Sequence, residues 1–376
     1  MNEKRHIVQI VGLMNRGGAE TMLMDIFRHL RGEFHFTFIV HYKGNTITKG
    51  DFDDEIRDLG GDIIHIRSVW ELGLKNYYRD LKTILDNLSP VHVLHSHLNS
   101  KGGTASWVAH YAGIQKILVH SHADIHFTGS FIKRVAYKAE LFLQKCFISS
   151  YATVNLACST AALSSLFFKK DILNKKSIII NNAIDCNKFT FQQKQASSSN
   201  QKLILGTVGR IAKIKRYELI IDILRELKER NIDFDFIFAG AAQDETYAKA
   251  IFNQIKEYNL QENVHWLGCR ADVEKIYPGM HIFLGTSISE GLGMSAVECQ
   301  ACGTACLLSK GFPPTADIKA GLVNFIDSDR PSDWVDAILS HSYPANITAE
   351  MINERLIKSG FSINHEIEKI RSIYNK

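Results

Sequence analysis

Short apolar runs with the character of buried β-strands alternate with helix-like segments along almost the whole chain. The runs in the first half are 7–11, 36–40, 62–66, 91–94, 117–119, 152–156 and 177–180. Those in the second half are 203–208, 234–238, 264–266, 281–285 and 304–308. Alternation of this kind is typical of parallel sheets that carry helices on both faces. The sequence therefore predicts an α/β fold built on doubly wound parallel sheets.

A polar stretch of low complexity, residues 192–201, interrupts the alternation. Because a chain of 376 residues has room for two or three domains, we interpret this stretch as a boundary. We expect a Rossmann-like domain at 1–195 and a second at 202–355. The segment 356–376 carries isoleucines at helical spacing, and we expect it to pack back on the first domain. Ligands of such sheets bind beyond the carboxyl ends of the strands, so both domains can line one cleft.

The composition argues against several functional classes. A net charge of +4 lacks the strong basic excess of a dedicated nucleic-acid binder. No apolar run approaches the length of about 18 residues that a membrane-spanning helix needs, and residues 1–6 do not resemble a signal peptide. The seven cysteines are scattered, which favours a reducing compartment, so we expect a cytoplasmic protein. Cys299 and Cys302 lack zinc-ligand partners and are interpreted as buried thiols.

Two glutamates flank a glycine turn in the segment Glu290–Glu298. A predicted strand leads into a loop with the first acid, then into two glycines, then into a helix that carries the second acid. A helix N-terminus offers free backbone N–H groups and the positive end of the helix dipole, which together bind anions. A carboxylate one turn further along the helix can accept hydrogen bonds from a pair of hydroxyl groups. The segment therefore favours a ligand that has both, such as a nucleotide diphosphate sugar.

Two further loops follow predicted strands. The loop 209–216 contains four cations, among them Arg210 and Lys215, and cations there can neutralise a diphosphate in place of a divalent metal. The Gly17-Gly18 turn follows the first strand and allows the backbone to approach a ligand closely. Each loop can also be interpreted without a ligand, the first as a solvated basic loop and the second as a tight turn.

Twelve of the 16 histidines lie at or before position 126. Two His-Ser-His triplets, His95–His97 and His120–His122, each stand at the end of a predicted strand, where period-two spacing points both histidines the same way. A metal site is conceivable, but only Asp124 supplies a nearby carboxylate. We expect most of these histidines to be satisfied within loops, and His122 to reach the cleft.

The predicted helix Phe131–Lys145 interleaves aromatic and aliphatic side chains with four cations. A helix of this kind can lie on an anionic membrane surface. It can equally be a domain helix with a charged outer face. The sequence leaves both interpretations open, and peripheral contact with the inner face of the plasma membrane is one of them.

Four motifs in this order resemble retaining glycosyltransferases of family 4, which have the GT-B fold. Glu290-x7-Glu298, with Gly291-Leu-Gly293 inside it and Ala301-Cys-Gly303 after it, is similar to the family signature. Gly209-Arg210 with Lys215 resembles its basic phosphate-binding loop. The segment 182–189 resembles a family segment near the interdomain hinge, and the segment 14–21 resembles the branch that builds bacterial capsule and exopolysaccharide. The resemblance covers about residues 6–340.

The resemblance implies a role for each matching position. Glu298 would accept hydrogen bonds from the two ribose hydroxyls, and Glu290 would hold a hydroxyl of the donor sugar. Arg210 and Lys215 would stabilise charge on the leaving diphosphate, and His122 would lie near the donor sugar. The other implied donor-binding positions are Gly17, Gly18, Cys269, Arg270, Gly291, Leu292, Gly293 and Met294, and those on the acceptor side are Arg16, His97 and Asn99.

The implied activity is transfer of a hexosyl or N-acetylhexosaminyl group from a nucleotide-diphosphate sugar, with UDP as the expected nucleotide, to a glycan or lipid-linked acceptor. No cofactor is expected. Asp51-Phe-Asp53 resembles the Asp-x-Asp metal motif of other transferases, but it precedes a predicted helix and is interpreted as helix capping. Alternatives are another GT-B enzyme, such as a nucleotide-sugar epimerase or a phosphorylase, and a non-catalytic protein that binds nucleotide sugars or carbohydrate. A nicotinamide-dependent dehydrogenase is discounted because its glycine fingerprint is missing.

Overall fold

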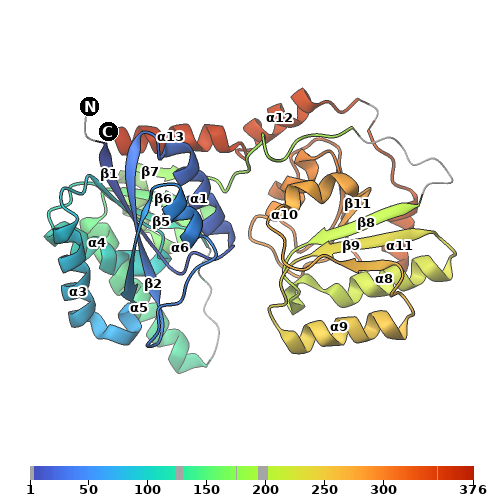
Figure 1. Ribbon diagram of the computed structural model, residues 1–376, viewed down its shortest axis with the longest axis horizontal. Coiled ribbons are helices and arrows are strands. Elements are labelled where there is room, and N and C mark those ends of the chain that lie inside the picture. Colours follow the sequence, from blue (N-terminus) through green and yellow to red (C-terminus); the bar gives the residue numbers. More distant parts are fainter. Residues whose placement is uncertain (1–3, 124, 126–129, 175, 194–201, 345) are drawn as a thin grey trace. The chain divides into compact units, whose positions relative to one another are not determined.

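The computed structural model describes residues 4–123, 125, 130–174, 176–193, 202–344 and 346–376. The chain folds into two α/β units (Figure 1), of which the first comprises residues 1–183 and 363–376 and the second residues 184–362. The prediction of two doubly wound parallel sheets is confirmed. The division falls between Ala183 and Ile184, so residues 184–193 belong to the second unit, whereas the sequence placed them in the first.

The first unit contains a seven-stranded sheet with the order β3-β2-β1-β4-β5-β6-β7. All neighbouring strands in it pair in parallel. Each strand overlaps one of the predicted apolar runs, because a strand covered by helices on both faces is apolar throughout. The strands are β1 (Arg5–Val11), β2 (Phe34–Tyr42), β3 (Asp62–Arg67), β4 (Val93–Ser96), β5 (Ile117–Ser121), β6 (Val154–Ala157) and β7 (Lys176–Ile179).

Eight helices accompany this sheet within the described residues. They are α1 (Gly18–Leu30), α2 (Asp53–Asp58), α3 (Val69–Asn87), α4 (Gly102–Tyr111), α5 (Phe131–Tyr151), α6 (Thr160–Leu166), α7 (Lys169–Asn174) and α13 (Ile363–Asn375). In the part of the chain that the structure describes, no helix is both long and apolar enough to cross a lipid bilayer.

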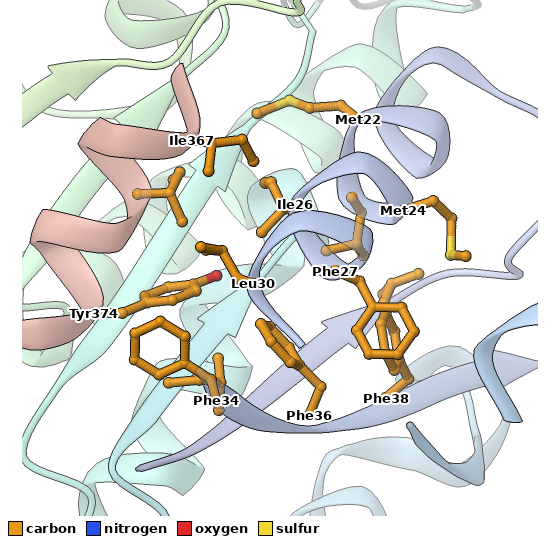
Figure 2. Close-up of a cluster of buried hydrophobic side chains, with 14 of the residues drawn as sticks. Met22, Met24, Ile26, Phe27, Leu30, Phe34, Phe36, Phe38, Ile367 and Tyr374 are labelled. Atoms are coloured by element: carbon orange, nitrogen blue, oxygen red, sulfur yellow. The ribbon is translucent and has the colours of Figure 1, made fainter. Parts of the chain in front are cut away.

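Helix α13 completes the core of the first unit, although it follows the whole second unit in the sequence. Figure 2 shows Tyr374 of α13 lying among side chains of α1 and β2, including Leu30 and Phe36. The ring of Tyr374 packs edge-on against that of Phe34, with their centroids 5.6 Å apart. The four isoleucines of α13 in this cluster are all buried, at positions 363, 367, 370 and 373.

The second unit contains a six-stranded parallel sheet with the order β10-β9-β8-β11-β12-β13. Its strands are β8 (Leu203–Val208), β9 (Phe234–Ala239), β10 (Val264–Trp266), β11 (Ile282–Gly285), β12 (Ala305–Ser309) and β13 (Val323–Ile326). Its helices are α8 (Tyr217–Glu229), α9 (Glu245–Glu257), α10 (Met294–Ala301), α11 (Pro331–Leu339) and α12 (Ala349–Lys358). The sequence missed β13, because this short edge strand has exposed residues at its centre and so lacks a buried apolar run.

Each sheet reverses its strand order once, between β1 and β4 in the first unit and between β8 and β11 in the second. Open parallel sheets bind ligands beyond the carboxyl ends of their strands at such a reversal. The loops after β8 and β11 are residues 209–216 and 286–293, which contain the basic loop and the first acid of the sequence motifs. The loops after β1 and β4 begin at residues 12 and 97.

We expect Ile370→Ala to destabilise the first unit by about 2–5 kcal/mol, because it truncates a fully buried side chain and leaves a cavity. Ile357→Ala on α12, whose side chain is 53% exposed, is the control and should cost less than about 0.5 kcal/mol. Urea unfolding followed by circular dichroism measures both. Equal midpoints for the two variants would contradict the placement of α13 in this core.

Candidate functional site

In the second unit, an ion pair joins the two loops at the strand reversal. Lys215 Nζ lies 2.5 Å from Glu290 Oε1, and the hydroxyl of Ser287 donates to the same oxygen at 2.6 Å. Both charged side chains are largely buried, with 22% of Lys215 and 14% of Glu290 exposed. The structure therefore brings together two residues that are 75 positions apart in the sequence and that the motifs placed in one site.

Backbone contacts hold these two loops against each other. The N–H of Ile288 donates to the carbonyl of Ile214 at 2.8 Å, and the hydroxyl of Thr286 donates to the carbonyl of Lys215 at 2.7 Å. The N–H of Glu290 donates to the carbonyl of Gly311 at 2.8 Å. The position of the ion pair is therefore fixed by the backbone and does not depend only on attraction between the two side chains.

A small pocket lies beside the ion pair and within the second unit. Arg210 is exposed and is not among its lining residues. The lining residues are Thr207, Val208, Gly209, Lys215, Tyr217, Phe283, Gly285, Thr286, Ser287, Glu290, Ser295 and Phe312.

Helix α10 begins at the end of the Glu290 loop. Gly293 precedes its first residue with φ of 70°, and a Cβ atom there would lie 2.6 Å from Cδ1 of Phe312. Only glycine fits this position, because both the left-handed backbone and the contact exclude a side chain. Gly291 is exposed, whereas Leu292 and Met294 are half-buried. No side chain caps the N-terminus of α10.

Glu298 lies on α10 and contacts a buried tyrosine. The hydroxyl of Tyr277 donates to Oε2 of Glu298 at 2.7 Å. Burial and the charge of Glu298 raise the pKa of Tyr277, so its hydroxyl stays protonated and remains a donor. The contact orients the second acid of the motif from the side of the protein core.

Cys269 and Arg270 follow β10 and are both exposed. The guanidinium of Arg270 forms two hydrogen bonds of 2.8 Å with the carboxylate of Asp272. Neither residue lines the pocket beside Glu290. Their implied contact with a nucleotide base therefore stays a prediction.

In the first unit, the Gly17-Gly18 turn forms the start of α1. Gly17 is the residue before the helix, and a Cβ atom there would lie 2.3 Å from Oε2 of Glu20. Arg16 is exposed and its guanidinium carbon lies 5.3 Å from the centre of the Phe52 ring. The turn therefore ends the loop that follows β1 and begins α1.

The interpretation of Asp51 and Asp53 as helix caps is wrong. The residue that precedes α2 is Phe52, and no side chain caps this helix. The carboxylate of Asp51 accepts a hydrogen bond from the backbone N–H of Arg16 at 3.1 Å. Asp53 is the first residue of α2, and its buried carboxylate lies 3.4 Å from Nε2 of His65.

Four histidines gather at the carboxyl ends of β4 and β5. His95 and His120 are fully buried within these strands, so they are not among the histidines that lie in loops. His97 Nδ1 lies 2.8 Å from His122 Nε2. Burial lowers the pKa of His95 to about 3 and that of His122 to about 4, so both are neutral near pH 7. His126, Asp124 and Thr128 lie outside the described residues.

The first two turns of helix α5 expose large apolar side chains beside cations. Phe131 and Ile132 are 73% and 79% exposed, and Lys133, Arg134 and Lys138 are exposed with them. Farther along the helix, Gln144 is buried and accepts hydrogen bonds from Thr104 of α4. The second half of α5 is therefore attached to α4.

Three curated proteins are similar to this chain over most of their length. The chain is 25% identical to EpsF of Bacillus subtilis (strain 168), which is described as a glycosyltransferase, over 100% of this chain and 97% of EpsF. It is 26% identical to the capsular polysaccharide biosynthesis glycosyltransferase CapH of Staphylococcus aureus, over 78% of each protein. It is 22% identical to the UDP-Gal:alpha-D-GlcNAc-diphosphoundecaprenol alpha-1,3-galactosyltransferase of Escherichia coli, over 75% of this chain and 74% of that enzyme.

A solved structure shares the fold. The crystal structure of Anabaena Alr3699/HepE in complex with UDP and glucose matches with a TM-score of 0.73 and 15% identity, over 98% of this chain and 99% of that chain. Residues 188–343 match the family described as glycosyl transferases group 1, and this range includes the ion pair and α10. The chain is therefore a glycosyltransferase, and its residues 188–343 form a glycosyl transferases group 1 domain.

Proposed function

We propose that this glycosyltransferase moves a hexosyl or N-acetylhexosaminyl group from a UDP-sugar to a glycan or lipid-linked acceptor, with retention at the anomeric carbon. The observation that carries the proposal is the Lys215–Glu290 pair beside the N-terminus of α10, at the strand reversal of the second sheet. The capsular relative CapH and the relative that acts on a diphosphoundecaprenol acceptor support the acceptor class. The HepE complex with UDP and glucose supports the donor class.

The contacts divide the binding of the donor among three groups. The Lys215 and Ser287 contacts are both with Oε1 of Glu290, so Oε2 can accept a hydrogen bond from a donor-sugar hydroxyl. Glu298, oriented by Tyr277, accepts from the ribose hydroxyls. The backbone N–H groups of residues 291–294 at the start of α10 bind the diphosphate.

The same contacts favour a same-face displacement without a covalent intermediate. Both motif carboxylates have binding roles in this scheme, Glu290 at a hydroxyl of the donor sugar and Glu298 at the ribose, so neither is assigned as a covalent nucleophile. The main catalytic contribution is then stabilisation of the leaving diphosphate by Lys215 and Arg210. These cations neutralise the negative charge of the diphosphate, as a divalent metal does in other transferases. We therefore propose that turnover requires no metal.

We also propose that α5 contacts an anionic membrane surface, where a lipid-linked acceptor would reside. Its exposed apolar and basic side chains suit the boundary between headgroups and acyl chains. An acceptor held at the membrane would thereby meet the enzyme at the same surface.

We expect Glu298→Ala to raise the Kd for a UDP-sugar about 10- to 100-fold, since hydrogen bonds to a charged group contribute about 1.5–3 kcal/mol.

Lys215→Ala should lower kcat about 10²- to 10³-fold with a smaller change in Kd, because its charge acts on the leaving group. Lys319→Ala, which removes an exposed cation from another loop, is the control. Calorimetry measures the Kd of each variant for the UDP-sugar. The rate of product formation gives kcat, and the same assay in EDTA tests whether turnover needs a metal.

Unchanged donor affinity in Glu298→Ala would contradict the ribose assignment. Loss of activity in EDTA, restored by Mg²⁺ or Mn²⁺, would contradict the metal-free proposal. Product analysis with and without acceptor separates the transferase from an epimerase, which needs no acceptor, and from a non-catalytic binding protein, which forms no product.

For the membrane contact, we expect the double variant Phe131→Ser/Ile132→Ser to lose most of its binding to vesicles that contain phosphatidylglycerol, because two exposed apolar anchors are removed. Ile357→Ser removes an exposed isoleucine from α12 and should bind like the unmodified protein. Co-sedimentation with vesicles measures the bound fraction. Equal binding of both variants would refute the contact.

A further inference from the structure

A continuous chain of hydrogen bonds runs from helix α13 to His122 inside the first unit. Nε2 of Gln9 donates to the hydroxyl of Tyr374 at 2.8 Å. Oε1 of the same amide lies 2.9 Å from Nε2 of His97. The other nitrogen of His97, Nδ1, lies 2.8 Å from Nε2 of His122. Three contacts thus join four side chains from β1, α13 and the ends of β4 and β5.

The direction of each hydrogen bond follows from the orientation of the Gln9 amide, whose Nε2 faces Tyr374 and whose Oε1 faces His97. In a neutral imidazole one nitrogen carries a hydrogen and the other accepts. Because Oε1 of Gln9 can only accept, Nε2 of His97 carries the hydrogen and Nδ1 of His97 is the acceptor. Nε2 of His122 must then donate, which leaves its Nδ1 without a hydrogen.

Burial keeps both imidazoles neutral, as this scheme requires. Burial and the neighbouring histidines lower the pKa of His97 well below its usual value, and burial lowers that of His122 to about 4. Nδ1 of His122 is buried and has no hydrogen-bond partner among the described residues. It is an acceptor whose partner the described chain does not supply.

Two further contacts hold the ends of this chain. The hydroxyl of Tyr374, having accepted from Gln9, donates to Nδ1 of His95 at 2.8 Å. The backbone N–H of His122 donates to Oδ1 of Asn99 at 2.7 Å. Asn99 has φ of 50°, a conformation that asparagine tolerates better than most residues. His122 is therefore restrained through both its ring and its backbone.

We propose that Gln9, His97 and Tyr374 are positioning residues, which hold His122 as its Nε2–H tautomer so that Nδ1 accepts a hydrogen bond from a sugar hydroxyl. The role of His122 at the sugar rests on the function proposed above. The tautomer itself follows from contacts within the first unit and can be measured separately. His97 and Asn99 thereby act through His122 rather than on the acceptor.

A metal ion is the competing interpretation of these histidines. One ring nitrogen from each of His95, His97 and His120 lies within 4.8 Å of the others. Both nitrogens of His97 already face hydrogen-bond partners, so ligation would break one of the contacts to Gln9 or His122. The shifts of these histidine pKa values arise from burial and from one another, with no carboxylate contributing to them. An uncompensated divalent charge would be costly to bury there.

The test compares two buried tyrosines of the first unit. Tyr374→Phe removes the hydroxyl that orients Gln9. Tyr77→Phe is the matched control, since the hydroxyl of Tyr77 is likewise buried and lies 2.8 Å from a histidine nitrogen, Nε2 of His41. Nitrogen-15 NMR of histidine-labelled protein reports which ring nitrogen carries the hydrogen, and the spectrum of His122→Asn identifies the signals of His122.

In the unmodified protein and in Tyr77→Phe we expect His122 to show a protonated Nε2 and a bare Nδ1. In Tyr374→Phe we expect a mixture of both tautomers and a kcat lowered about tenfold at little-changed KM for the donor. A hydrogen on Nδ1 of His122 in the unmodified protein overturns the proposal, as does a single unchanged tautomer in Tyr374→Phe. Stoichiometric binding of added Zn²⁺ that shifts the His97 signals also overturns it.

The two proposals fail in different ways. If no UDP-sugar supports transfer, the proposed function fails, while the NMR comparison of the tyrosine variants still decides the tautomer. If transfer occurs but the tautomer is unaffected by Tyr374→Phe, only the positioning chain is refuted.

Discussion

The reversal of strand order in each parallel sheet is the constraint on which both candidate sites depend. Neighbouring crossovers leave in opposite directions at β1/β4 and at β8/β11, and open parallel sheets bind ligands beyond the strand ends at such a reversal. In the second unit the loops that follow these strands carry Lys215 and Glu290. In the first unit the carboxyl ends of β4 and β5, next to the reversal, carry the four histidines. The sheet topology therefore fixes where chemistry is possible before any side chain is considered.

The two sites solve the problem of buried polar groups differently. In the second unit the charges of Lys215 and Glu290 are paired, and the hydroxyl of Ser287 donates a hydrogen bond to the same carboxylate. In the first unit burial removes the charge itself, and neutral imidazoles interact through directed hydrogen bonds. A paired charge responds to the charge of a ligand, whereas a chain of neutral donors and acceptors selects the direction in which a ligand must hydrogen-bond.

Much of the fold was predictable, because a parallel sheet covered on both faces leaves continuous apolar runs such as 7–11 and 203–208. β13 was missed because it is a partly exposed edge strand. The boundary was misplaced because polarity identifies a loop, whereas residues 184–193 belong to the second unit through packing: Phe189 and Ile184 lie in its core.

The candidate sites were predictable to a similar degree. Motif spacing placed Lys215 and Glu290 at adjacent strand ends, and the structure joins them. The contacts of Gln9 and Tyr374 with the histidines were not predictable, since the two residues are 365 positions apart and neither belongs to a motif. Their side chains resemble ordinary strand and helix residues in the sequence, and only tertiary packing brings them to His95 and His97. A buried polar residue in the middle of an apolar strand, as Gln9 is in β1, is the signal that could have indicated such a partner.

Helix α13 has a consequence for the order of folding during synthesis. The second unit is one continuous segment, so all of its core is available as soon as residue 362 has left the ribosome. The first unit, although its sheet is made earlier, must wait for α13 to cover the apolar side chains of α1 and β2. The core of the first unit is therefore complete only after the last helix of the chain has been synthesised. A chain truncated before residue 363 would lack the buried side chains of α13 and leave part of the apolar surface of α1 and β2 uncovered.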